Sequence, residues 1–197
     1  MQFYFFAQPW WVNLLILVPV LAYLGWRRWG LDLGRQQLIY SAIFGVAFGF
    51  VEAAGVVYLR GAVGLLPGYG GTLDEVRRLS SSIYHQAEAV GQLPESLLKI
   101  EVFREAATLF VLVSVALLAA AARRERFALF LWVFAIWDIC YYAGLWVTVR
   151  WPPSLATPDV LFLIPEPWLA QVWFPITISV LTVVAVIFGR RAPTRLS

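Results

Sequence analysis

The chain has very little cysteine, histidine and charge, and each shortage excludes a class of protein. Its one cysteine, Cys140, lies in an apolar run, so no disulfide can form within the chain. Its one histidine, His85, excludes a haem held by two histidines and argues against a di-iron bundle centre, which needs Glu-x-x-His on each of two helices. Charged residues make up 14% of the chain, well below the roughly 25% of soluble domains.

Familiar catalytic and nucleotide-binding motifs are also missing. The sequence has no Walker loop, dinucleotide fingerprint, Gly-x-Ser-x-Gly elbow, His-Glu-x-x-His or Cys-x-x-Cys. The net charge of +3 does not point to nucleic acid, because the basic residues form short clusters beside apolar runs. No lysine or arginine precedes the first apolar run, so we interpret that run as a retained span and not as a cleaved signal peptide.

What the chain has in abundance is long apolar runs. Hydrophobic residues make up 61% of it, and about 20 consecutive apolar residues suffice to cross a bilayer as a helix. The sequence therefore predicts an all-α integral membrane bundle of five transmembrane helices, forming a single domain over residues 1–197. The predicted spans cover about 10–26, 37–59, 99–122, 127–149 and 168–188.

Two longer segments connect these spans on one side. In 60–98, Thr72 and Glu75 form a capping box before a helical apolar stripe, which predicts an amphipathic helix on the bundle or at the lipid interface. The segment 150–167 is rich in proline and is expected to be a loop. Its apolar patch, 161–164, is too short to cross a membrane and could dip into the interface.

Arginine clusters predict the orientation. Three short clusters fall on the same side of the five-span plan: Arg27, Arg28 and Arg35; Arg123, Arg124 and Arg126; and Arg190, Arg191 and Arg195. Since short basic segments stay in the cytoplasm, the N-terminus is expected outside and the C-terminus inside. With no targeting segment recognised, a bacterial inner membrane is the expected location.

Charged residues inside the predicted spans gather in the outer half of the bundle. Glu52 follows Gly45 and Gly49 on one stripe of the second span, where small residues allow close helix approach. Glu101, Arg104, Glu105 and Thr108 recur at i, i+3, i+4 and i+7 and share one face of the third span. Asp138 lies near the middle of the fourth span, with Tyr141 and Tyr142 one turn nearer the outside.

These residues predict an acidic pocket, covered by the loops that carry His85 and Glu166. The four acids outnumber Arg104, and their excess negative charge cannot stay ionised in low dielectric without help. Protons, a cation or outside water must neutralise or solvate it. Protons would suit acid–base chemistry or proton relay, and a cation would mean a metal site.

The candidate catalytic residues are Glu52, Arg104, Glu105, Asp138, Tyr141 and Tyr142. The candidate ligands of an all-oxygen divalent metal site, for Ca²⁺, Mg²⁺ or Mn²⁺, are Glu52, Glu101, Glu105 and Asp138. No other cofactor is indicated. Structural alternatives remain open for several of them: Glu101 could simply be solvated, Arg104 could form an ion pair with Glu105 or Asp138, and one tyrosine could serve packing.

Three functions fit this pattern. The first is an enzyme or binding protein for a lipid-soluble small molecule, in which Glu52 and Asp138 act as acid–base groups or metal ligands and Arg104 holds an anionic group. The second is a non-catalytic subunit of a larger complex, whose partners would be other membrane subunits besides the lipid bilayer. The third, proton or cation conduction, is disfavoured because the chain has no internal repeat.

Overall fold

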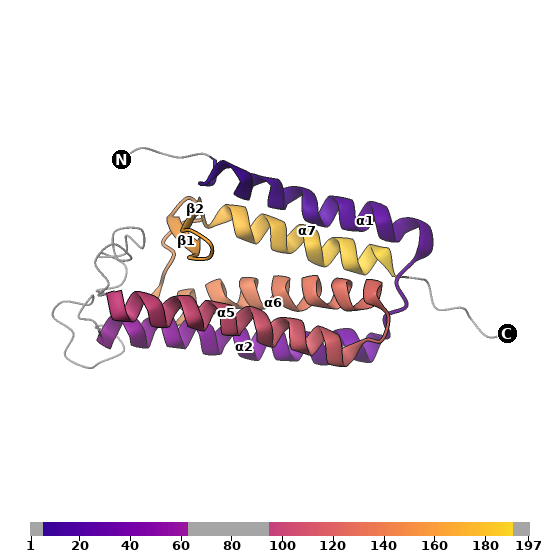
Figure 1. Ribbon diagram of the computed structural model, residues 1–197, viewed down its shortest axis with the longest axis horizontal. Coiled ribbons are helices and arrows are strands. Elements are labelled where there is room, and N and C mark those ends of the chain that lie inside the picture. Colours follow the sequence, from indigo (N-terminus) through magenta and orange to yellow (C-terminus); the bar gives the residue numbers. More distant parts are fainter. Residues whose placement is uncertain (1–5, 63–94, 191–197) are drawn as a thin grey trace.

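The computed structural model describes residues 6–62 and 95–190, and helices dominate it (Figure 1). The helices are η1 Trp10–Ile16, α1 Leu17–Trp29, α2 Arg35–Ala62, α5 Glu95–Ala119, α6 Arg123–Val149 and α7 Trp173–Gly189; the strands are β1 Pro158–Phe162 and β2 Trp168–Gln171. The amphipathic helix expected after Thr72, with His85, lies outside the described residues.

Four of the predicted spans appear as helices long and apolar enough to cross a membrane. They cover Trp10–Trp29, Arg35–Leu59, Glu95–Ala119 and Arg123–Val149. These helices indicate a membrane-embedded protein, and their large exposed apolar side chains, such as Phe103, Phe110 and Leu118 on α5, suit contact with lipid.

The predicted fifth span differs at its start. Residues 168–171 form strand β2, and the helix α7 begins only at Trp173 and has 17 residues. Pro175 lies in the first turn of α7, where proline costs no helical hydrogen bond. At about 1.5 Å per residue, α7 is shorter than a bilayer core of about 30 Å.

The proline-rich segment forms a hairpin that the all-α prediction missed. Strands β1 and β2 pair antiparallel, with Asp159 opposite Ala170, and Gln8 exchanges two backbone hydrogen bonds with Leu169 on β2. The hairpin satisfies its backbone polar groups at the end of an apolar bundle, where unpaired groups would be costly. In Figure 1 it lies in the left-hand part of the molecule, directly before the start of α7.

Helix α6 is the centre of the bundle, with α2, α5 and α7 packed around it and α1 packed on α7. The predicted small-residue stripe of α2 makes its contact with α6 very close. A Cβ added to Gly49 would lie 2.6 Å from the carbonyl oxygen of Trp137, and one added to Gly45 would lie 3.1 Å from Ile136 Cγ2. The stripe is confirmed as a helix-packing surface, and it fixes α6 beside Glu52.

The end of the bundle opposite the hairpin gathers arginines from three of the predicted clusters. There Arg124 pairs with the buried Glu125, whose Oε1 also accepts the backbone N–H of Asp32, and Arg190 donates to the carbonyl of Leu33. The helices run alternately up and down, so the hairpin and the arginines lie at opposite ends (Figure 1).

Candidate functional site

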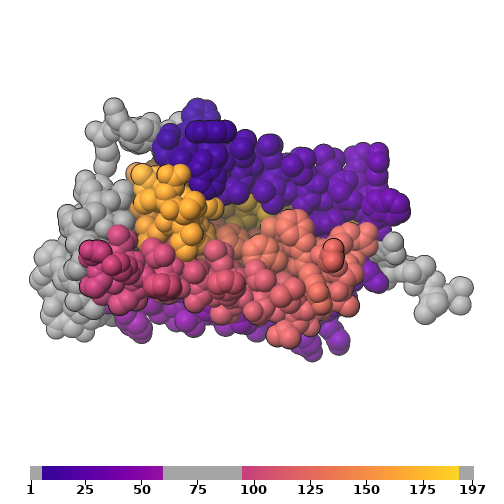
Figure 2. Space-filling view, viewed as in Figure 1, coloured from indigo at the N-terminus to yellow at the C-terminus, as the bar shows by residue number. Residues whose placement is uncertain are grey.

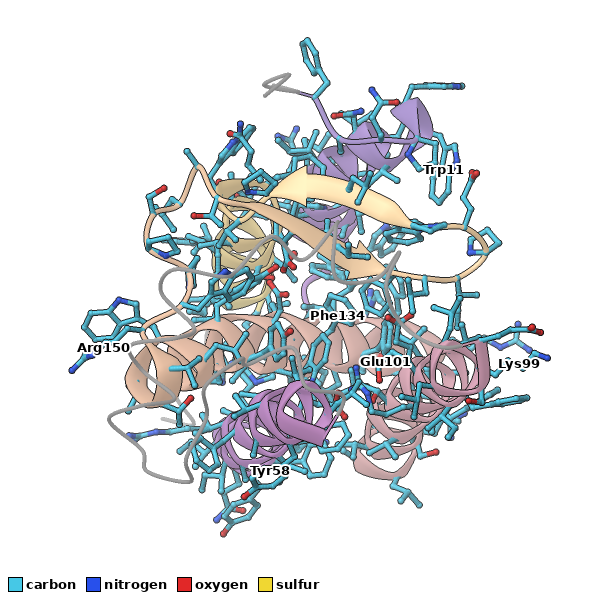
Figure 3. All side chains as sticks on the ribbon, turned by 90° about the vertical axis from the view of Figure 1, so that its left-hand side faces the viewer. Trp11, Tyr58, Lys99, Glu101, Phe134 and Arg150 are labelled. Carbon is cyan, nitrogen blue, oxygen red and sulfur yellow. The ribbon has the colours of Figure 1, made fainter. Side chains whose placement is uncertain are left out.

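A cavity of about 150 Å³ lies beneath the hairpin, between α2, α5, α6 and α7. All seven predicted pocket residues line it: Glu52, Glu101, Arg104, Glu105, Asp138, Tyr141 and Tyr142. Figure 3 views this end of the molecule and shows Glu101 on α5 and Phe134 on α6 turned toward the space under the hairpin, whereas Tyr58, Lys99 and Arg150 point away from it. The sequence pattern therefore identified side chains that share one cavity.

Arg104 lies between two carboxylates from different helices. It forms a salt bridge with Glu52 on α2, and its Nε donates to Glu101 Oε2 over 2.9 Å, one turn away on α5. Thr108 completes the group by donating a hydrogen bond of 2.8 Å to Glu52 Oε1. Both oxygens of Glu52 are therefore engaged. The alternative of an ion pair with Glu105 or Asp138 is not what forms: Arg104 pairs with Glu52 on the neighbouring helix α2 and with Glu101 one turn away on α5.

Glu105 connects α5 to the hairpin. Its Oε2 accepts a 2.7 Å hydrogen bond from the backbone N–H of Leu163, the residue after β1. The residue is 9% exposed. Its other oxygen, Oε1, accepts no hydrogen bond from residues 6–62 or 95–190 and remains open to the cavity.

Asp138 on α6 is arranged in the same way. Its Oδ2 accepts a 2.8 Å hydrogen bond from the hydroxyl of Ser179 on α7, and the residue is 7% exposed. Within the described part of the chain Oδ1 has no hydrogen-bond donor and faces the cavity. Two buried carboxyl groups on different helices thus each have one oxygen that can contact a ligand in the cavity.

Two polar residues of this cavity were missed by the sequence analysis. Asp159 on β1 is 1% exposed and accepts a 2.6 Å hydrogen bond from the hydroxyl of Tyr142 and a 2.8 Å bond from the N–H of Val160. Ser179, the partner of Asp138, was the other. The one signal for Asp159 in the sequence was its position close to the apolar patch 161–164. The prediction of a loop over 150–167 gave this acid no role.

Aromatic rings form one wall of the cavity. Trp137 stacks on Tyr141 with ring centroids 6.1 Å apart, and Phe134 stacks on Phe162 of the hairpin at 6.2 Å. Trp168 on β2 lies 5.3 Å from Phe162. The lining also includes Leu15 on η1 and Phe174, Pro175 and Ile178 on α7.

The charge of the lining is strongly one-sided. Five carboxyl groups line the cavity, those of Glu52, Glu101, Glu105, Asp138 and Asp159. Among the described lining residues Arg104 is the one cation, so the excess would be four negative charges if every acid were ionised. Asp159 makes the imbalance one charge larger than the sequence count.

A metal centre gains no support from this arrangement. Across 6–62 and 95–190, no three side chains of histidine, cysteine, aspartate or glutamate are placed to hold a metal ion. Glu166, expected to cover the pocket, does not line it and instead accepts a hydrogen bond from the indole of Trp11. Cys140 is outside the lining as well.

No protein-family model, curated protein or solved structure matches the chain. The cavity and its side chains are therefore the features of the molecule that bear on its function.

Proposed function

We propose that this protein binds a lipid-soluble small molecule in the cavity under the hairpin and exchanges protons with it through Glu105 and Asp138. The observation that carries the proposal is the pair of buried carboxyl groups, on α5 and α6, that each keep one oxygen open to a cavity with aromatic and aliphatic side chains in its lining. General acid–base catalysis needs such a group within hydrogen-bond reach of the reacting atom.

The remaining polar residues hold these two acids in place. Arg104 pairs with Glu52 and Glu101, and Thr108 donates a hydrogen bond to Glu52. These contacts join α2 to α5. The Tyr142–Asp159 bond fastens the hairpin to α6. In this assignment Glu52 and Arg104 are positioning residues.

In the proposed topology the chain crosses a bacterial inner membrane five times, with its N-terminus outside and its C-terminus in the cytoplasm. The fifth crossing combines α7 with the hairpin, whose strands satisfy one another's backbone groups. The arginines at the end opposite the hairpin support a cytoplasmic position for that end. The cavity then lies in the outer half of the membrane.

The two rival functions are less well supported. A subunit that lends its charges to a partner would keep Arg104 available, yet Arg104 is paired inside the chain. A conductor needs polar groups along its length, whereas the bundle beyond the cavity has a core that includes Leu112, Leu129, Val133 and Val186, all fully buried.

The test is to identify small molecules that co-purify with the protein or are converted by it. Purified protein is incubated with a lipid extract, and the extract is compared by untargeted mass spectrometry before and after. We expect species that are bound or converted by wild type and by Glu95→Gln and Asp32→Asn, whose changes lie on exposed acids. Glu105→Gln and Asp138→Asn should lose them. Retention of the same binding and conversion in both variants would overturn the proposal.

A further inference from the structure

We infer that the molecule bound in this cavity is a cationic amphiphile, with a positively charged nitrogen among the carboxyl groups and an apolar tail along α1 and α7. The inference rests on the proposed function and specifies the chemical class of its ligand. It is carried by the charge of the lining, the pairing of Arg104, the aromatic wall and the shape of the molecular surface.

Arg104 is not available to an anionic ligand. Its Nη1 faces Glu52, and its Nε and Nη2 face Glu101, so all three of its nitrogens are directed at carboxylates. An anionic group would have to displace one of these partners and would then leave a carboxylate unpaired in low dielectric. The role first expected for Arg104, holding an anionic group, does not fit this geometry.

The carboxyl groups of Glu105 on α5 and Asp138 on α6 both line the cavity, each with one oxygen left open. Neither lies in an ion pair within the described chain. A positively charged group between them would offset the cost of burying two carboxylates, as a proton otherwise must. An anionic group offers no such compensation, and a neutral group offers only a hydrogen bond without the opposite charge.

The aromatic wall is suited to the same kind of charge. Ring faces attract cations electrostatically, and tryptophan and tyrosine do so best. Trp137, Tyr141, Phe134 and Phe162 line the cavity next to the acids. Acids and rings together resemble the aromatic cages that recognise quaternary ammonium groups in general.

The apolar tail of the ligand is inferred from the apolar part of the cavity lining and from the outer surface of the molecule. Leu15 on η1 and Phe174 and Ile178 on α7 make this part of the cavity lining apolar. Figure 2 shows the surface hollowed beside the orange hairpin, between indigo α1 above and α5 and α6 below, with α7 at its floor. A hollow at this place would let an alkyl chain pass from the cavity into the surrounding lipid.

Three probes of equal chain length test the inference: decyltrimethylammonium, decyl sulfate and 1-decanol. Each is titrated against the full chain in a neutral maltoside detergent, and bound probe is counted by native mass spectrometry. We expect the cation to bind at least about tenfold more tightly than the other two, since a charge interaction of this kind is worth roughly a factor of ten or more. Glu105→Gln and Asp138→Asn should each remove most of that preference.

Matched controls are Glu95→Gln on the same helix as Glu105, and Asp32→Asn at the other end of the bundle; both side chains are exposed. They should keep the preference. If decanol or decyl sulfate binds as tightly as the cation to wild type, the inference is wrong while the proposed function stands. If none of the three probes binds saturably and no lipid extract species is bound or converted, both fail. Should one variant not give monodisperse protein, the other variant and the wild-type comparison still decide.

Discussion

Arg104 shows how a guanidinium is accommodated in an apolar helix. Its side chain is 30% exposed, and the side chains of its partners Glu52 and Glu101 are 8% and 13% exposed. A buried ion pair contributes little relative to a well-packed apolar pair, yet removing one partner leaves an uncompensated charge. The stability of the α2–α5 contact should therefore depend on both partners being present.

A double-mutant cycle tests this at Glu52 and Arg104. We expect Arg104→Met alone to lower the free energy of unfolding by about 3 kcal/mol, the low end of the range for broken buried pairs, because part of Arg104 is exposed. The double variant with Glu52→Gln should be more stable than the sum of the two single losses. Denaturant or thermal unfolding in detergent measures the three variants.

The control pair for this cycle is Glu95 and Lys99, one turn apart on α5. Their nitrogen and oxygen lie 2.6 Å apart, but the side chains are 81% and 68% exposed, so breaking the pair should change stability by less than about 1 kcal/mol. Strictly additive losses at Glu52 and Arg104 would show that the two residues do not interact in the membrane protein.

Tyr142→Phe should loosen the hairpin. The change removes the 2.6 Å hydrogen bond that the hydroxyl donates to the buried Asp159, a loss of about 1–3 kcal/mol. Faster amide exchange over 158–171, with α2 unchanged, is the expected result in a hydrogen-exchange experiment. Tyr58→Phe is the control because Tyr58 is 74% exposed, and equal exchange in both variants would contradict the assigned role.

At the scale of the helices, the α2–α6 contact sets the position of the site. Gly49 lies against the backbone of Trp137, next to Asp138 in the chain, and Gly144 on α6 lies against Ala53, next to Glu52. Side-chain atoms cannot enter this contact without separating the two helices, and separation would move Glu52 on α2 away from Asp138 on α6.

Gly49→Ala is therefore expected to destabilise the protein by about 1–3 kcal/mol through overpacking, and to weaken ligand binding with it. Gly55→Ala on the same helix is the matched control: a Cβ there meets nothing within 4 Å. It should be neutral or should stabilise by up to about 1 kcal/mol, because alanine is the better helix former. Equal melting temperatures for the two variants would mean that the helices are not in contact at Gly49.

The helices could be predicted from sequence and the hairpin could not, for a physical reason. Long apolar runs have few folds open to them in lipid, so their length alone indicates helix. In β1 the side chains do not alternate between apolar and polar, and its pairing depends on β2. The hairpin is further held by Gln8 and Glu105, far away in the chain, and no local pattern reveals such partners.

The candidate site, which draws on helices and the hairpin from the whole molecule, was also only partly predictable from the sequence. Helical spacing and the distance along each span correctly predicted that Glu52, Glu105 and Asp138 lie at one end of the bundle. Both quantities follow from the residues' positions in the sequence. The pairing of Arg104 with Glu52 depends on which helices are neighbours and could not be predicted, whereas Glu101 lies one turn away on the same helix face. Asp159 and Ser179 enter the site only through the hairpin and α7.

Labelling of single cysteines tests the orientation of the molecule. In a Cys140→Ala background, Ser154→Cys lies at the hairpin end and Asp32→Cys at the arginine end, both on exposed positions. A maleimide that does not cross membranes should label the first in intact cells and the second only after permeabilisation, as expected if the arginines are cytoplasmic. The reverse pattern would invert the topology and place the cavity on the cytoplasmic side.

The bond between Glu105 and the N–H of Leu163 spans 58 residues, and that between Asp138 and Ser179 spans 41. During synthesis, each acid leaves the ribosome well before the group that will satisfy it. Until those groups are made, Glu105 and Asp138 need water or a temporary partner. A nascent chain cut short after α6 would lack both of these partner groups, and we expect it to be degraded faster than the full chain.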